Sequence, residues 1–150
     1  MRPDEVREHL KKIVDRMVSR SVLENAGNYA IMMILLRTQT GKDIHGNPFD
    51  QYSPKYLRQK IGLGKYSGRV DMSLKGNMLN DMQTAVKRSN EAYEVKVGYL
   101  PGKSAEESIN KARWHNRDGA GRSRKIRAFV GLTASEKAQM LSWFKQNVRL

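Results

Sequence analysis

Apolar residues recur every three or four positions along the first forty residues of the chain. The stripe runs from Val6 to Ile34, and Arg37 takes the next position at the same spacing. Pro3, followed by acidic residues, is typical of a helix start. We therefore predict a helical region over residues 1–39, about 55 Å long if it is continuous. Its weakest point is expected at Gly27, because only proline is a poorer helix former than glycine.

The segment from Tyr29 to Leu36 is apolar on every side. A helix without a polar face is buried all round, which a single small domain rarely achieves by itself. We expect a neighbouring subunit to cover part of it, with Tyr29, Met32, Met33 and Leu36 as the interface residues. The segment is far shorter than the roughly 20 residues that span a bilayer, so no membrane association is predicted.

The period changes from helical to alternating after residue 78. Apolar and polar residues alternate on both sides of a turn at 89–92, which predicts a β-hairpin. A capping box, Thr133 with Glu136, predicts a terminal helix that reaches about Val148.

The remaining segments complete a single domain over residues 1–150. Residues 40–54 are rich in turn formers, residues 55–61 suit a short helix, and residues 104–114 suit another. This order predicts an α+β fold, in which a long N-terminal helix and a C-terminal helix pack on a small antiparallel sheet.

Basic residues are concentrated in one part of a chain whose net charge is +13. Residues 111–127 hold seven basic residues and one acidic residue, and we predict a flexible basic loop at 116–127. Such a patch attracts nucleic acid or an acidic protein surface, although a solvated loop without a partner is the simpler alternative. The candidate contact residues are Arg113, Arg117, Arg122, Arg124, Lys125 and Arg127.

Motifs that carry chemistry are incomplete or missing. Residues 98–104 follow a predicted strand like a phosphate-binding loop, but Val97 stands where that motif needs glycine, and Pro101 lacks a backbone N–H. His9, His45 and His115 are too far apart in sequence to suggest a metal cluster. We therefore predict no catalytic, cofactor or metal residues, and a phosphate-handling enzyme is the weakest of the functional alternatives.

The chain has no cysteine and does not open with a charged and then apolar leader. These features suggest a protein that is made in a reducing cytoplasm and is not a secretory precursor.

Four segments, taken in order, resemble the phage virion-morphogenesis and tail-completion family. They are GKDIHGNPFDQYSP at 41–54, LKGNMLNDM at 74–82, VKVG at 95–98, and ARWHN at 112–116 followed by RAFVGLT at 127–133. Within these segments, glycines and a proline suit tight turns and two phenylalanines suit the core. The fold-specifying residues are therefore Gly46, Pro48, Phe49, Gly76, Phe129 and Gly131.

The resemblance implies a structural virion protein of a tailed phage, and not an enzyme. Members of the family would form a homo-oligomeric ring at the neck, by analogy six-fold, in contact with tail terminator or tail tube proteins and head-side connector proteins. Genomic DNA would pass through the lumen, so the expected location is the virion neck, after assembly in the host cytoplasm.

Two functions remain open for the basic loop. A DNA-binding protein that grips phosphates through residues 111–127 is the alternative to the neck reading, although no DNA-binding motif accompanies the loop. Within a neck ring, the loop would face either the genome or an acidic rim on a neighbouring protein. We favour the protein contact, because a channel that holds DNA tightly would resist its passage.

Overall fold

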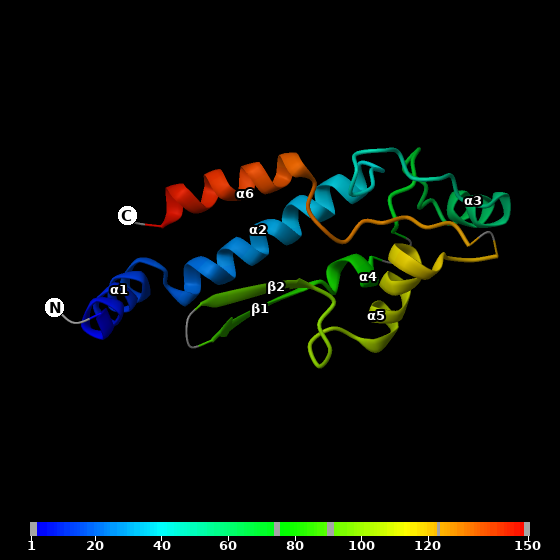
Figure 1. Cartoon of the computed structure of the whole chain (residues 1–150). Helices are drawn as coiled ribbons and strands as arrows, with labels where there is room; N and C mark the ends of the chain where they lie inside the picture. The colour runs from blue at the N-terminus through cyan, green and yellow to red at the C-terminus, as the bar shows by residue number, and fades with distance from the viewer. Residues whose placement is uncertain (1–2, 74–75, 90–91, 123, 149–150) are drawn as a thin grey trace.

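Helix α2 forms the centre of the molecule, between the C-terminal helix α6 on one side and a two-stranded antiparallel sheet on the other (Figure 1). A computed structural model describes residues 3–73, 76–89, 92–122 and 124–148. The α+β prediction is confirmed. The elements are α1 (Pro3–Met17), α2 (Arg20–Gln39), α3 (Pro54–Gly62), α4 (Asn77–Asn80), β1 (Gln83–Arg88), β2 (Tyr93–Gly98), α5 (Glu106–Arg113), the π-helix η1 (Trp114–Asp118) and α6 (Ala134–Asn147).

The helical region at the N-terminus divides at Ser19 and not at the predicted weak point, Gly27. The Ser19 side chain caps α2 by accepting a hydrogen bond from the Val22 N–H at 3.3 Å. Gly27 instead lies inside α2, where a Cβ atom would stand 2.2 Å from Cγ2 of Thr84 on β1. The glycine therefore allows the strand to approach the helix closely.

The predicted β-hairpin is present. β1 and β2 pair from Gln83 opposite Gly98 to Arg88 opposite Tyr93, and the Ser89 N–H donates to the Ala92 carbonyl at 2.9 Å across the turn. Half-buried and exposed residues alternate along β2, and the whole hairpin lies against α2. This is the pattern expected of a sheet with one covered face.

The core lies at the junction of α2, the sheet and the segments around residues 49 and 129. Phe129 is completely buried and Phe49 is 5% exposed, so both phenylalanines serve the core as predicted. Gly76 directly precedes α4 and has a φ of +80°, a conformation that favours glycine. Gly46 and Gly131 also have positive φ, and Pro48 forms an isolated backbone bridge with Lys42.

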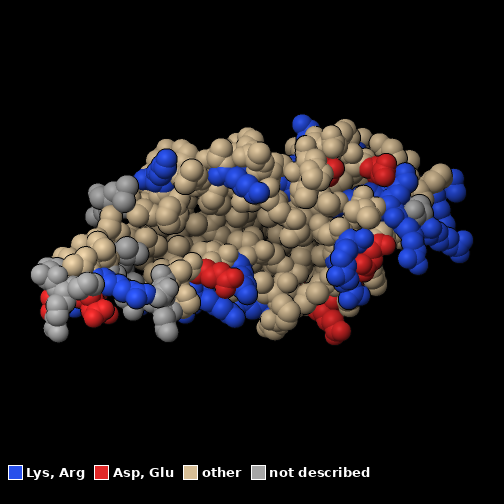
Figure 2. Space-filling model, viewed as in Figure 1, with Lys and Arg blue, Asp and Glu red and all other residues tan. Residues whose placement is uncertain are grey.

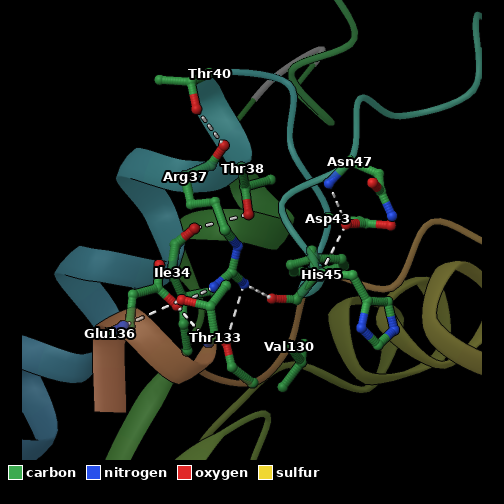
Figure 3. A network of polar contacts seen from close by, with 12 residues as sticks. Ile34, Arg37, Thr38, Thr40, Asp43, His45, Asn47, Val130, Thr133 and Glu136 are labelled. Carbon is green, nitrogen blue, oxygen red and sulfur yellow. Dashed lines mark hydrogen bonds and ion pairs between the residues drawn. The ribbon is translucent and has the colours of Figure 1, made fainter. Parts of the chain in front are cut away.

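A buried ion pair joins α6 to α2 (Figure 3). The Arg37 guanidinium donates to the Glu136 carboxylate, and also to the carbonyl oxygens of Phe129 and Gly131 at 2.5 and 3.0 Å. Glu136 in turn accepts from the Thr133 N–H at 2.7 Å, which completes the predicted capping box. The start of α6 and the end of α2 are thus joined by one polar network.

Candidate functional site

Helices α3, α4 and α5 lie towards the end of the molecule opposite α1 (Figure 1). A pocket of about 1050 Å³ opens between the starts of α3 and α4, helix α5 and η1. Among the described residues, its charged lining consists of four cations and one carboxylate, and its apolar lining consists mainly of aromatic rings and methionines. The charged residues are Lys55, Lys111, Arg122, Arg127 and Glu107; the apolar ones include Tyr52, Tyr56, Met72, Met78 and Trp114.

Local signals in the sequence position the two walls of this pocket. On one side Ser53 caps α3, accepting from the Tyr56 N–H at 3.4 Å, and Pro54 occupies the first turn. On the other side α5 continues directly into η1, which places Trp114 and His115 in the wall. The predicted loop at 116–127 therefore begins later than expected, because residues 116–118 belong to the π-helix.

Asn116 fastens η1 to the segment that carries Phe129. Its amide nitrogen donates to the Ala112 carbonyl at 2.7 Å, and its oxygen accepts from the Phe129 and Val130 N–H groups at 2.9 Å each. Both the oxygen and the nitrogen of the Asn116 amide are therefore hydrogen-bonded. The π-helix is held by these side-chain bonds as well as by its own backbone.

His115 lines the pocket as a half-buried neutral imidazole. Burial lowers its pKa to about 4, and the neighbouring Arg127 charge acts in the same direction. Its Nδ1 atom is buried and has no hydrogen-bond partner among the residues that the structure describes. The pocket wall therefore holds one polar atom whose hydrogen-bonding capacity is unused.

A buried lysine lies behind the pocket, and the sequence pattern did not identify it. The Lys60 side chain is fully buried, and its Nζ donates to Asp71 Oδ1 at 2.6 Å, to Tyr52 Oη at 3.4 Å and to the Ser73 carbonyl. The only signal in the sequence is that Lys60 shares a helical face with Tyr56.

The pKa values of Asp71 and Tyr52 indicate how this cluster is ionised. Burial acts to raise the pKa of Asp71, but hydrogen bonds from Lys60, Ser73 and Ser67 outweigh it and lower the pKa below its usual range. Burial, followed by the Asp71 charge, raises the pKa of Tyr52. The cluster is therefore an ion pair with a protonated tyrosine, and it braces the segment after α3 without exposing a reactive group.

The six basic candidates from the sequence have different roles. Arg113 and Arg117 both pair with Asp118, at 3.2 and 2.9 Å, and Lys125 lies 3.6 Å from Asp50. Among the described side chains, Arg122 and Arg124 have no hydrogen-bond or ion-pair partner.

Arg127 is the exception in this group because it is only 6% exposed. Its guanidinium donates to the backbone carbonyls of Asp50 and Gln51, at 3.0 and 2.9 Å, and lies over the Tyr52 ring. The prediction of a surface contact is therefore corrected for this residue: Arg127 anchors the chain and contributes only to the pocket wall.

The glycines of the basic loop serve a folded turn. Ala120 and Lys125 form an isolated antiparallel bridge, and Gly119 has a φ of +82°. A Cβ atom on Gly119 would stand 2.2 Å from the Arg124 carbonyl oxygen, so the turn requires glycine there. The flexibility expected of residues 116–127 stays a prediction.

The apolar segment of α2 is only partly covered by the described chain. Met33 is 7% exposed and belongs to the protein's own interior, and Tyr29 stacks on Trp143 at 5.6 Å between ring centroids. Met32 and Leu36 are 46% and 55% exposed. The interface prediction is therefore corrected: Met33 is not accessible to a partner, and Met32 and Leu36 carry the exposed apolar surface of this helix.

A second apolar surface lies on α1. Val6, Leu10 and Ile13 share one face of this helix and are between 39% and 56% exposed. α1 packs broadly against no other helix or strand in the described part of the chain.

Figure 2 shows an uncharged band along the middle of one face, whereas basic side chains gather at the end that holds α3.

The loop at 98–104 uses its polar groups internally. Ser104 Oγ donates to the Asp81 carbonyl at 2.8 Å, and Lys103 Nζ donates to the Thr84 carbonyl at 3.1 Å. The Asp81 carboxylate accepts from the Ala105 N–H at 2.7 Å, at the start of α5. A carboxylate of the protein itself therefore occupies the helix N-terminus where a phosphate would bind.

The described residues contain neither a metal-binding cluster nor a membrane-spanning helix. No group of three or more histidine, aspartate or glutamate side chains is arranged to hold a metal ion. None of the described helices combines the length and the apolar character that crossing a membrane requires.

Comparisons with known proteins give no match to a protein-family model, a curated protein or a solved structure.

Proposed function

We propose that this chain is a structural subunit of a tailed-phage virion, which forms a ring at the neck and completes the tail or joins it to the head. The observation that carries the proposal is that the four segments resembling the tail-completion family all contribute to one core. Phe49 comes from the first segment, Leu79 from the second, Val97 from the third and Phe129 from the fourth.

Backbone contacts join the same segments. The Ile44 N–H donates to the Ala128 carbonyl at 2.9 Å, and Arg127 bonds the carbonyls of Asp50 and Gln51. The first and fourth segments are therefore direct neighbours in the fold. Their convergence supports the view that they specify one fold, and the family resemblance then suggests the neck as its place of action.

Exposed apolar surface provides the means of assembly in this proposal. Met32 and Leu36 on α2 are exposed apolar side chains, and so are those on the apolar face of α1. Exposed apolar side chains that lie together often mark a protein–protein contact. A neighbouring subunit would cover them, in a six-fold ring by analogy. Tail terminator or tail tube proteins and head-side connector proteins would be the other partners, and genomic DNA would pass through the lumen.

Single charges on α2 test the proposal. In a phage that carries this gene, Leu36→Lys or Met32→Lys should leave heads and tails unjoined in electron micrographs, because a lysine cannot be buried unpaired in a subunit contact. Asn25→Lys, at an exposed polar position of the same helix, is the matched control. Normal head–tail joining with either α2 charge in place would refute the proposed interface, and normal virions without the gene would refute the neck role.

DNA binding through residues 111–127 is the second candidate. It is favoured by Arg122 and Arg124, which are exposed and have no ion-pair partner among the described residues. It ranks below the neck role because the other four candidates are paired or buried. A gel shift at two salt concentrations tests it. If the loop contacts several phosphates, the affinity should fall steeply as salt is raised. If only Arg122 and Arg124 contact DNA, the affinity should fall only slightly, which would speak against DNA binding as the function.

A further inference from the structure

We propose that the pocket between α3, α5 and η1 binds an acidic segment of a protein partner, with an apolar side chain inserted against its methionines. The inference deepens the neck proposal by giving the chemistry of a partner. It rests on the pocket itself, so it can fail or hold separately from the neck role.

The charge of the pocket favours an anionic occupant. Among the described residues, Lys55, Lys111, Arg122 and Arg127 line it, against one carboxylate, that of Glu107. Glu107 pairs with Lys111, one turn away on α5. Its negative charge is therefore balanced within the pocket wall. Lys55 and Arg122 have no ion-pair partner among the described residues, and they approach the pocket from different elements. Carboxylates spaced along a peptide would complement this arrangement.

The interior of the pocket favours a side chain over a purely ionic ligand. Met72 and Met78 line it, and methionine adapts its shape to apolar groups of different form. Trp114 is 47% exposed, which leaves an aromatic surface uncovered in the wall. At about 1050 Å³ the pocket slightly exceeds the roughly 300–1,000 Å³ typical of small-molecule sites, so it has room for a peptide segment.

Nucleic acid fits the same pocket less well. Single strands bind by stacking successive bases on successive aromatic faces, along a groove that follows the phosphates. Here the Tyr52 ring is already covered by Lys60 and Arg127, at 4.9 and 5.7 Å, and Tyr56 packs edge-on against it. Trp114 is therefore the one pocket aromatic in the described chain with a largely open surface.

His115 adds a polar side chain to the pocket wall. The imidazole lines the pocket, is neutral at neutral pH and has a buried Nδ1 without a partner among the described residues. A neutral imidazole carries one N–H, which can donate to a carboxylate oxygen.

Fluorescence of the purified full chain provides the experiment. The chain has two tryptophans, so Trp143→Phe leaves Trp114 as the only indole reporter. The probes are a short peptide that alternates glutamate with leucine, a glutamate-only peptide of the same length, and an oligothymidylate of matched charge. Labelled forms of each give dissociation constants by anisotropy.

The glutamate–leucine peptide should shift the Trp114 emission to the blue and bind about ten-fold more tightly than either other probe. The double change Lys55→Gln with Arg122→Gln, and separately Trp114→Ala, should each weaken its binding by about ten-fold. Lys137→Gln, an exposed lysine on α6 away from the pocket, should leave the binding unchanged.

Three results would overturn the inference. They are absence of peptide binding, an equal loss of binding in Lys137→Gln, and equal or tighter binding of the oligothymidylate through the same residues. The last would assign the pocket to nucleic acid. None of them bears on whether Leu36→Lys blocks head–tail joining, so the failure of this inference is distinguishable from failure of the neck proposal.

Discussion

Arg37 shows how a single charged residue on an apolar stripe can determine the packing of two helices. It falls at helical spacing from Met33 and Ile34, where a leucine would have continued the stripe. The structure buries it at 8% exposure, with Glu136 and two backbone carbonyls as acceptors. Sequence spacing indicated that position 37 faces inward, but the partner 99 residues away is a tertiary fact that spacing does not contain.

Removing the Arg37 charge should strongly destabilise the protein. Arg37→Met leaves the Glu136 carboxylate buried without its cation, which should lower the free energy of unfolding by about 3–5 kcal/mol. Urea denaturation measures the change. The double variant Arg37→Met with Glu136→Gln should recover part of the loss, since no buried charge is then unpaired. A loss below about 1 kcal/mol in the single variant would show that the pair contributes little.

His115 should make the stability depend on pH in mildly acidic solution. Its pKa is about 4 in the folded protein, against an ordinary 6.5, so the unfolded chain binds more protons between these values. The free energy of unfolding should therefore rise as the pH increases from 4 to 6.5. Above pH 6.5 the contribution of His115 is complete, and the free energy should no longer change because of this residue. The expected rise is roughly 2 kcal/mol, after allowance for the partial exposure of the ring.

Two histidine variants isolate this effect. His115→Gln should flatten the pH dependence of the urea midpoint between pH 4 and 6.5, whereas His45→Gln, at an exposed turn, should leave it unchanged. If the wild-type and His115→Gln profiles run parallel across this window, then burial does not depress the pKa of His115.

At the scale of elements, local signals predicted structure well and tertiary contacts decided the rest. The capping box at Thr133 and the alternation in the hairpin are short-range patterns, and both are present. The π-helix at 114–118 has no such signal, because Asn116 is held there by bonds to Phe129 and Val130. The division at Ser19 had one, a serine at a helix N-cap, but the continuous apolar stripe obscured it.

The close approach of α2 and β1 gives a prediction at this scale. Gly27→Ala should destabilise the protein by about 1–3 kcal/mol, although alanine is the better helix former, because its Cβ would stand 2.2 Å from Thr84 Cγ2. Chemical denaturation of the variant checks the change. Thr84→Ala should rescue most of it in a double-mutant cycle, and Asn25→Ala is the exposed control on the same helix. Equal or greater stability of Gly27→Ala would show that the strand moves aside freely.

At the scale of the whole molecule, the distribution of charge differs from the linear sequence. Residues 111–127 carry a net charge of +6, but Asp50 lies beside Lys125, and Arg127 is largely buried, with the pocket wall as its remaining exposure. Sequence could locate the basic patch, since charge is a property of composition. It could not locate the pocket, because the pocket walls come from α3, α4, α5 and η1, and only folding brings them together.

The separation of α1 from the rest of the molecule supports a final prediction. Residues 4–10 of this helix are exposed, and α1 does not pack broadly against any other described element. Deleting residues 1–18 keeps the Ser19 cap of α2, so the free energy of unfolding should change by less than about 0.5 kcal/mol. Urea denaturation of the truncated and full chains measures this difference.

The same deletion should abolish head–tail joining if the apolar face of α1 is an assembly surface. Val6→Ser with Leu10→Ser, which keeps the length of the helix but removes two apolar side chains, should reproduce the defect, whereas Lys12→Ser on the same helix should not. Electron microscopy of phage lysates distinguishes the two. A large loss of stability in the truncated chain would mean that α1 is part of the folding unit. Intact joining would instead leave Met32 and Leu36 as the sole apolar candidates proposed for contact between subunits.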